Sequence, residues 1–277
     1  MPHRVSLPDG ETVPALGQGT WRMGEQPGRR AQELAALREG VALGMTLIDT
    51  AEMYGDGGAE SLLGDALAGL RDQVFLVSKA CPQNASRVRL ARACEASLRR
   101  LKTDRLDLYL LHWRGSTPLA ETVEAMQALE AEGKIRHWGV SNFDVDDLED
   151  LLEAGGGDCA TDQVLYNPAR RGIEYDLAPW MAARRMPVMA YTPLEPTRLL
   201  RSRGLADVAA ARGVTPLQVA LAWVLRLPDV IAIPKASSVE HVRENRQALE
   251  LTLTAAELDR LDQAFLPPKG KASLEML

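Results

Sequence analysis

The stretch Thr46-Leu-Ile-Asp-Thr-Ala-Glu-Met-Tyr-Gly-Asp-Gly-Gly-Ala-Glu-Ser-Leu-Leu-Gly-Asp-Ala-Leu-Ala-Gly-Leu70 decides the fold. Residues 46–50 form a short apolar run, which is typical of a parallel strand covered on both faces. Residues 60–70 repeat apolar side chains at helical spacing. A strand followed directly by a helix is one unit of an α/β fold, so the architecture depends on how often this unit recurs.

The strand–helix unit recurs along the whole chain. Strands are predicted at Ala15–Gly19, Thr46–Thr50, Val74–Lys79, Leu106–His112, Arg136–Ser141, Thr161–Tyr166, Val188–Thr192 and Val230–Pro234. Helices are predicted at Arg30–Leu43, Glu60–Leu70, Val88–Leu101, Leu119–Glu132, Val145–Glu153, Leu177–Arg185, Leu205–Arg226 (broken) and Val239–Leu249. Eight such units predict an α/β chain folded as a (β/α)8 TIM barrel.

Two elements are predicted outside the eight units. The Asp9-Gly10 pair lies between short extended runs, which predicts a β-hairpin at the N-terminus. Thr254-Ala-Ala-Glu257 has the spacing of a capping box and opens an extra C-terminal helix. Because no linker or low-complexity tract interrupts the alternation, residues 1–277 are predicted to form a single domain. An open Rossmann sheet is disfavoured because no G-x-G-x-x-G turn follows a strand.

Composition limits the classes of function. The net charge is −6, and the one basic stretch, Arg87 to Lys102, alternates with apolar residues as on a solvated helix face, so no nucleic-acid partner is expected. Three cysteines without metal-ligand spacing indicate a reducing compartment and no metal site. No apolar run is long enough to be a secretory signal or to span a bilayer, so we expect no membrane association and a cytoplasmic location.

Polar residues close every predicted strand, and in a (β/α)8 barrel these positions face the active site. Asp49, Lys79 and His112 end strands two, three and four, and Tyr54 follows Asp49 in the next loop. An ammonium beside a phenol lowers its pKa, so Lys79 is expected to tune Tyr54. Asp49 would balance the lysine, and His112 would orient a carbonyl oxygen. Singly, each residue also fits a structural role, but together they predict an acid–base site.

These residues resemble the aldo-keto reductase family. Gly44-Met-Thr-Leu-Ile-Asp49-Thr-Ala-Glu-Met-Tyr54-Gly is similar to the family segment that holds its catalytic Asp and Tyr, and the strands ending at Lys79 and His112 are similar to those that hold its Lys and His. The further matches are Gly139-Val-Ser-Asn-Phe143, Gln163-Val-Leu-Tyr-Asn-Pro168, Ala190-Tyr-Thr-Pro-Leu194 and Ile233-Pro-Lys-Ala-Ser237. The resemblance implies reduction of small aldehydes or ketones by hydride from NAD(P)H, with Tyr54 as proton donor.

The resemblance also implies how the cofactor is held. Ser141, Asn142 and Gln163 would bind the carboxamide, and Tyr191 would stack on the nicotinamide ring. Lys235 and His241 would face the 2′-phosphate, which implies a preference for NADPH. Many members have arginine in place of this histidine, so the use of NADH remains open. The complete set assigned to the cofactor is Thr20, Trp21, Ser141, Asn142, Gln163, Tyr191, Thr192, Pro193, Leu194, Ile233, Lys235, Ala236, Ser237, Ser238, His241, Glu244 and Asn245.

Trp21, Met53 and Trp113 follow strand ends and are expected to line the substrate pocket. The short tail from Leu266 to Leu277 favours an open pocket and small substrates, and family habit favours a monomer. Two other readings are kept: a Schiff-base lyase that uses Lys79 as nucleophile, and a subunit that senses NADPH without turnover. The physiological carbonyl compound cannot be read from the sequence.

Overall fold

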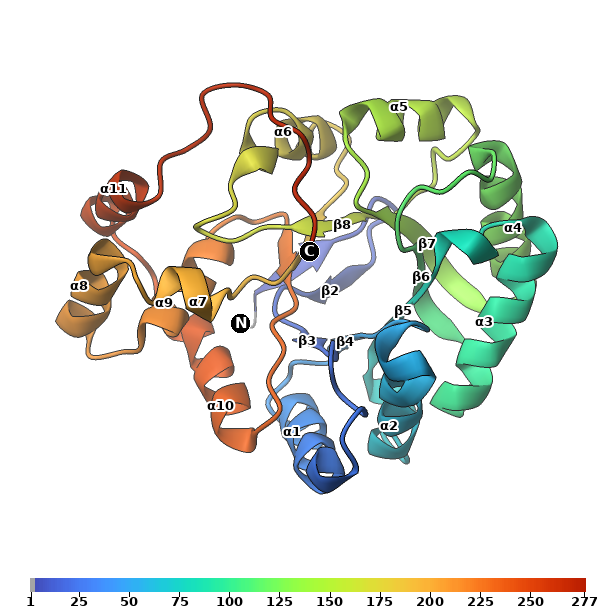
Figure 1. Cartoon of the computed structure of the whole chain (residues 1–277), viewed down its shortest axis with the longest axis horizontal. Helices are drawn as coiled ribbons and strands as arrows, with labels where there is room; N and C mark the ends of the chain where they lie inside the picture. The colour runs from blue at the N-terminus through green and yellow to red at the C-terminus, as the bar shows by residue number, and fades with distance from the viewer. Residues whose placement is uncertain (1–2) are drawn as a thin grey trace.

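The computed structural model describes residues 3–277 and confirms the barrel. Eight parallel strands form one sheet in the order β3 to β10, and helices surround it (Figure 1). The strands are β3 (Gln18–Gly19), β4 (Leu47–Asp49), β5 (Phe75–Ala80), β6 (Leu106–Leu111), β7 (Ile135–Ser141), β8 (Asp162–Leu165), β9 (Val188–Tyr191) and β10 (Val230–Ala232). Each lies within about two residues of its predicted end, except that only the last two residues of the first predicted strand count as β3.

The first and last strands of the sheet close the barrel. Gly17 N–H donates to the carbonyl of Ala232 at 2.8 Å, and Gly19 N–H donates to the carbonyl of Pro234 at 3.0 Å. A Cβ at Gly19 would lie 2.7 Å from the carbonyl oxygen of Ile233, closer than real Cβ contacts come. Glycine is therefore required for this close approach of two backbones.

The helices match the predicted alternation. They are α1 (Arg30–Ala42), α2 (Gly58–Ala66), α3 (Arg87–Leu101), α4 (Leu119–Ala131), α5 (Val145–Glu153), α6 (Leu177–Ala182), α7 (Pro196–Leu199), α8 (Arg203–Arg212), α9 (Pro216–Val224), α10 (Val239–Gln247) and α11 (Ala255–Ala264). The break predicted within 205–226 separates α8 from α9, and capping boxes open α9 and α11 at Thr215 and Thr254. The four-residue α7 was not predicted, because it is too short to show helical periodicity.

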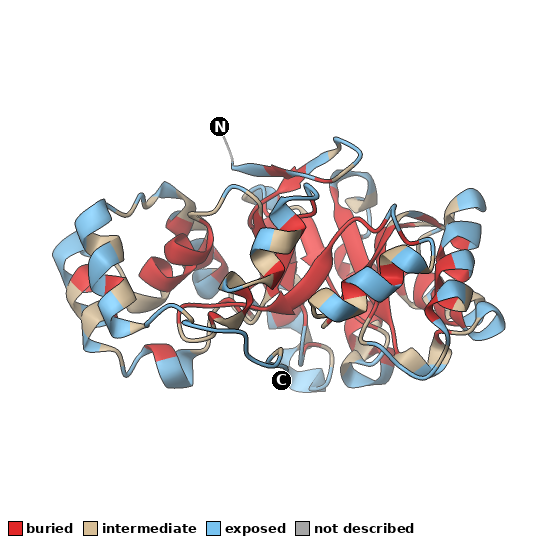
Figure 2. Cartoon of the chain, turned by 90° about the horizontal axis from the view of Figure 1, so that it is seen from above, coloured by how far each residue is buried: buried red, intermediate tan, exposed pale blue. Residues whose placement is uncertain are grey.

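The core lies inside the barrel and between the barrel and its helices. Residues of the central strands are almost all buried, while the outer faces of the helices are exposed (Figure 2). The N-terminal hairpin lies at one end of the barrel and the C-terminus at the other (Figure 2). The end that carries the C-terminus is the mouth formed by the carboxyl ends of the strands.

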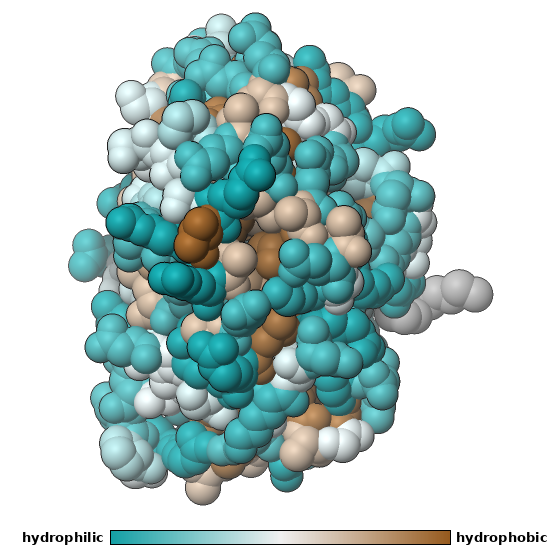
Figure 3. Space-filling model, turned by 90° about the vertical axis from the view of Figure 1, so that its right-hand side faces the viewer, coloured by the Kyte–Doolittle hydropathy of each residue, from teal (hydrophilic) through white to brown (hydrophobic). Residues whose placement is uncertain are grey.

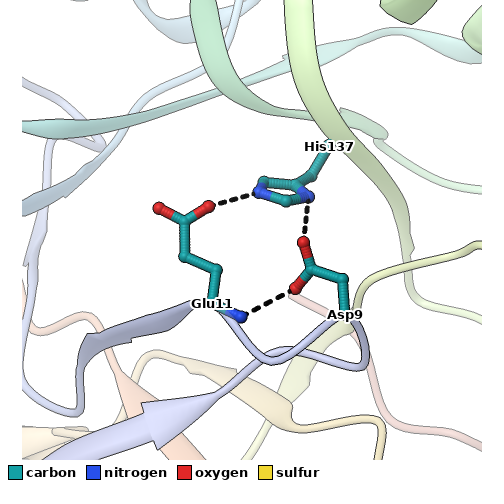
Figure 4. Close-up of side chains that lie close together, drawn as sticks. All are labelled: Asp9, Glu11 and His137. Carbon is teal, nitrogen blue, oxygen red and sulfur yellow. Dashed lines mark hydrogen bonds and ion pairs between the residues drawn. The ribbon is translucent and has the colours of Figure 1, made fainter.

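The predicted hairpin is formed by β1 (Arg4–Ser6) and β2 (Thr12–Pro14), which pair antiparallel. Its turn is fastened to β7 through His137 (Figure 4). The Nε2 atom of His137 lies 2.7 Å from Glu11 Oε2, and its Nδ1 atom lies 3.7 Å from Asp9 Oδ2. Arg136 adds an ion pair to Glu11 at 2.7 Å. The two carboxylates contact opposite nitrogens of one ring and so act as a tie between hairpin and barrel.

The face on the side of α3 and α4 is predominantly hydrophilic, with hydrophobic side chains only in isolated places (Figure 3). Arg87, Arg89, Arg92 and Arg99 of α3 are exposed, whereas Leu90 and Leu98 are buried. The basic stretch is therefore an amphipathic helix packed on the barrel, as its spacing indicated. Within residues 3–277 no helix combines the length and the apolar character needed to cross a membrane.

Candidate active site

The strand ends surround one deep cavity of about 640 Å³ at the mouth of the barrel. Its lining comes from the ends of seven of the eight strands or the loops that follow them, β5 being the exception, and from α9, α10 and the C-terminal tail. Of the residues predicted for the site, it is lined by Trp21, Asp49, Met53, Tyr54, His112, Trp113, Ser141, Asn142, Gln163, Tyr191, Thr192, Pro193, Leu194, Ile233, Lys235, His241, Glu244 and Asn245. Its volume lies within the ordinary range for small-molecule sites, ~300–1,000 Å³.

Lys79 and Asp49 form a buried ion pair below the cavity. The Lys79 side chain is fully buried, and its Nζ atom lies 2.7 and 2.8 Å from the two oxygens of Asp49. It also donates to the carbonyl oxygen of Thr50 at 2.8 Å and lies 3.4 Å from the Tyr54 hydroxyl. Residues at the end of β4 thus hold the Lys79 ammonium in place, and one of its contacts is with the hydroxyl of Tyr54.

The same contacts determine the charge states of this cluster. Burial raises the pKa of Tyr54 above its ordinary value, and the Lys79 ammonium acts in the opposite direction. Lys79 therefore does lower the pKa of Tyr54, as expected from the sequence. Burial raises that pKa by more, because most of the phenol is removed from water. Burial alone would lower the pKa of Lys79, yet Asp49 and Tyr54 together hold it above its ordinary value. At neutral pH the phenol keeps its proton and the lysine keeps its charge.

His112 lies beside Tyr54, with ring centroids 5.9 Å apart in an edge-to-face arrangement. Burial, aided by the charge of Lys79, lowers the pKa of His112 to about 3, so the imidazole is neutral. Its Nδ1 atom is enclosed and has no hydrogen-bond partner among residues 3–277. Nε2 is therefore the ring nitrogen that a molecule in the cavity can reach.

Amide and hydroxyl groups lie next to the ion pair. Gln163 Nε2 donates to Asp49 Oδ1 at 2.8 Å, and Ser141 Oγ donates to the backbone carbonyl of Gln163 at 2.7 Å. The Tyr191 hydroxyl donates to Asn142 Oδ1 at 2.9 Å. Asn142 adopts a left-handed backbone conformation with φ of 60°, which turns its side chain along the cavity wall.

At the far end of the cavity lie a cationic side chain and the start of α10. Burial lowers the pKa of Lys235, and the nearby Arg29 and Arg22 lower it further, while Glu33 opposes them. Ser238 caps α10 by accepting a hydrogen bond from the His241 backbone N–H at 3.3 Å. His241 itself is exposed and lines the cavity. A helix N-terminus beside a lysine is a favourable place for an anion.

Some predicted site residues do not line the cavity. Lys79 lies behind Tyr54 and Asp49, and Thr20 is buried with its hydroxyl donating to the Asp49 carbonyl oxygen at 3.0 Å. Ala236, Ser237 and Ser238 also lie outside the lining. The Ser237 hydroxyl is buried and has no partner in the described part of the chain.

Other lining residues were not predicted: Gly19, Pro196, Thr215, Leu217, Gln218, Pro234, Met276 and Leu277. The short tail also takes part in the pocket, because Met276 and Leu277 reach the cavity. Lys271 holds the tail by an ion pair with Asp146 at 3.3 Å, and Arg170 holds it through Glu275. The sequence indicates this docking only through the charges of Lys271 and Glu275, and it does not show which residues they would pair with.

A comparison with known proteins identifies the family. A model of the aldo/keto reductase family matches residues 15–265. The chain is 54% identical over 272 residues to the methylglyoxal reductase YeaE of Escherichia coli (strain K12), covering 96% of each chain. It is 30% identical over 258 residues to a glyoxal reductase of Bacillus subtilis (strain 168), covering 93% of this chain and 91% of the relative.

Solved structures agree with the sequence relatives. A crystal structure of an aldo/keto reductase from Klebsiella pneumoniae in complex with NADP and acetate superimposes with a TM-score of 0.97, at 54% identity and with both chains fully covered. Family model, relatives and structure extend over nearly the whole chain. The chain therefore belongs to the aldo/keto reductase family and is an NAD(P)H-dependent carbonyl reductase.

Proposed function

We propose that this chain reduces small aldehydes, 2-oxoaldehydes such as methylglyoxal among them, and that Tyr54 donates the proton. The observation that carries the proposal is the contact of Lys79 Nζ with both Asp49 oxygens and with the Tyr54 hydroxyl at the base of the cavity. Asp49 fixes the ammonium, and the ammonium contacts the phenol. This arrangement is that of a positioned general acid.

The donor set of the cavity suits a phosphorylated dinucleotide. Hydrogen-bonding groups of Asn142 and Gln163 lie at one end and the cation Lys235 lies at the other, beside His241 and the start of α10. These residues would hold a nicotinamide carboxamide and a phosphate, respectively, and the flat ring of Tyr191 offers a stacking surface. When bound, NADPH supplies the hydride, and the protein supplies orientation and electrostatics.

The residues of this chain then have separate tasks. His112, neutral at working pH, orients the carbonyl oxygen through a hydrogen bond from Nε2. Tyr54 retains its proton because burial raises its pKa, and it donates that proton to the oxygen as negative charge develops there. Lys79 stabilises the phenolate that remains. Trp21, Met53 and Trp113 present apolar surface and keep water from the reacting groups.

The substrate class rests on the relatives and on the size of the cavity. The chain is 54% identical to a methylglyoxal reductase. The tail residues Met276 and Leu277 narrow the opening, so compact carbonyl compounds suit it better than bulky ones. The preference for NADPH rests on Lys235 and His241 as partners of a 2′-phosphate.

A steady-state screen tests this function. Methylglyoxal, glyoxal, benzaldehyde and a bulky ketone are assayed with NADPH and NADH at equal concentration, with parent enzyme and Tyr54→Phe in parallel. We expect the highest kcat/KM for small aldehydes with NADPH, and a loss of at least about 100-fold in the variant. NADPH binding without turnover of any carbonyl compound would instead support a cofactor-sensing subunit.

A Schiff-base lyase is disfavoured by the state of Lys79. Its amine must be free to attack a carbonyl carbon. Here Nζ is fully buried, bonded to Asp49, and held charged because its pKa lies above the ordinary value. Borohydride trapping of an adduct at Lys79 in the absence of NADPH would reverse this conclusion.

The remaining parts of the proposal concern the state of the chain. We propose a single domain over residues 1–277, supported by the family match over 15–265 and by the ion pairs that hold the tail on the barrel. A cytoplasmic monomer is proposed as well. The cytoplasmic location is supported by Cys81, Cys94 and Cys159, which all lie within the described residues and are unpaired, as is usual in a reducing compartment.

A further inference from the structure

The loop that carries Tyr54 runs from Thr50 to Gly57, between β4 and α2, and has an unfavourable backbone. Gly55, Asp56 and Gly57 follow one another with φ of 56°, 51° and 84°. Glycine adopts this conformation readily, so the unfavourable residue is Asp56, the one non-glycine of the three. Within the loop the Tyr54 N–H donates to the carbonyl oxygen of Ala51 at 3.1 Å, and contacts from outside the loop add to this bond.

The strongest such contact outside the ion pair comes from Glu52. Its Oε1 atom accepts a hydrogen bond from the Cys81 backbone N–H at 2.6 Å and another from Asn84 Nδ2 at 2.8 Å. Its own backbone N–H donates to the carbonyl oxygen of Lys79 at 3.3 Å. Glu52 thereby ties the loop of Tyr54 to the end of β5, two residues beyond the lysine that contacts the phenol.

The separation that this tie controls is close to the limit of a hydrogen bond. Lys79 Nζ lies 3.4 Å from the Tyr54 hydroxyl, whereas its contacts with Asp49 are shorter than 3.0 Å. The lysine is held by Asp49 and by the Thr50 carbonyl oxygen at the start of the loop, so a movement of the loop beyond Thr50 changes the distance to Tyr54 and not the ion pair. A further few tenths of an ångström would end the contact.

We propose that Glu52 is a positioning residue for the proton donor: its carboxylate holds the loop of Tyr54 against the end of β5 and so maintains the contact between Lys79 and Tyr54. The proposal rests on the proposed role of Tyr54. It assigns Glu52 no contact with substrate or cofactor, and Glu52 is absent from the cavity lining.

The test separates this role from a general structural one. Glu52→Gln keeps an Oε1 acceptor for Cys81 N–H and Asn84, whereas Glu52→Ala removes it. We expect kcat for Glu52→Ala to fall by about 10–100-fold, in line with the cost of misplacing a catalytic group by up to 1 Å, and Glu52→Gln to stay within about threefold of the parent. Glu121→Ala is a matched control, because Glu121 accepts the Arg87 backbone N–H at 3.0 Å at the far end of the same β5–α3 connection.

The pH profile is the decisive readout. The groups that face Tyr54 are Lys79, Asp49, Cys81, His112 and Tyr191. Moving the phenol away from Lys79 ends their hydrogen bond and weakens the charge effect, the two influences of Lys79 that lower the pKa of Tyr54. Alcohol oxidation with NADP⁺, which needs the phenolate, must therefore rise at a higher pH in Glu52→Ala than in the parent. Glu52→Gln and Glu121→Ala are expected to keep the parental profile.

Several results would overturn the proposal. Parental kcat in Glu52→Ala, or a reduced kcat with an unshifted profile, would mean that the tie does not act on Tyr54. A fall of kcat in Glu52→Gln as large as that in Glu52→Ala would mean that the negative charge of Glu52, and not its hydrogen bonds, is what matters. If Glu52→Ala does not fold, Asn84→Leu, which removes one of the two bonds, must still shift the profile upward. A parent enzyme that reduces no carbonyl compound would refute the proposed function itself, independently of these variants.

Discussion

Replacing Lys79 by Met isolates the buried ion pair. Lys79 is fully buried, and its removal leaves the Gln163 amide as the one side-chain donor to the Asp49 carboxylate among residues 3–277, while the Thr50 carbonyl oxygen loses the Lys79 ammonium. Breaking a buried pair by removing one partner costs about 3–5 kcal/mol. At roughly 2–4 °C per kcal/mol for a chain of this size, the Tm is expected to fall by about 6–20 °C.

Thermal unfolding followed by circular dichroism measures this loss. Lys134→Met is the matched control, because Lys134 pairs with Glu95 at 2.8 Å at the surface, where such pairs contribute about 0–1 kcal/mol. Adding Asp49→Asn to Lys79→Met removes the unpaired charge, so the double variant is expected to regain much of the lost stability while remaining inactive. A double variant as unstable as Lys79→Met would show that the unpaired Asp49 charge does not cause the loss. A Tm loss in Lys79→Met no larger than that of Lys134→Met would show that the buried pair contributes no more than a surface pair.

Two further predictions concern the cofactor and pH. His241→Arg is expected to tighten the binding of NADPH several-fold and that of NADH hardly at all, because arginine adds a bidentate donor for phosphate. Lys235→Ala should weaken the binding of NADPH far more than that of NADH. Fluorescence titrations in which both cofactors respond equally would show that these residues do not contact the 2′-phosphate. His112 has a folded pKa of about 3, below the unfolded value of ~6.5, so the unfolded state binds more protons between these values and stability falls as pH is lowered through this window. The stability deficit of His112→Gln should therefore shrink as pH falls from about 7 to 4, and a constant deficit in urea titrations would contradict the depressed pKa.

The barrel and the core of the site could be predicted because both follow from local patterns. Parallel strands of a barrel end at one mouth, so Asp49, Lys79 and His112 at consecutive strand ends had to lie near one another. The cofactor and the reaction were identified from the family resemblance, because patterns of charge and hydrophobicity do not indicate them.

Other features depend on contacts between distant segments. Met276 and Leu277 reach the cavity through ion pairs of Arg170 and Lys271, and Leu217 reaches it from α9. Sequence spacing does not encode such docking. The net pKa of Tyr54 was also unpredictable, because the direction depends on whether burial or Lys79 has the larger effect.

Single-turnover reduction of methylglyoxal with enzyme-bound NADPH measures whether Tyr54 is the proton donor. Among residues 3–277 the Tyr54 hydroxyl has one side-chain hydrogen-bond partner, Lys79 at 3.4 Å, so Tyr54→Phe should fold normally and bind NADPH with nearly parental affinity. We expect nicotinamide oxidation, followed by its absorbance, to slow by at least about 100-fold in this variant. A variant that retains more than about a tenth of the parental rate, with NADPH fully bound, would show that another group supplies the proton.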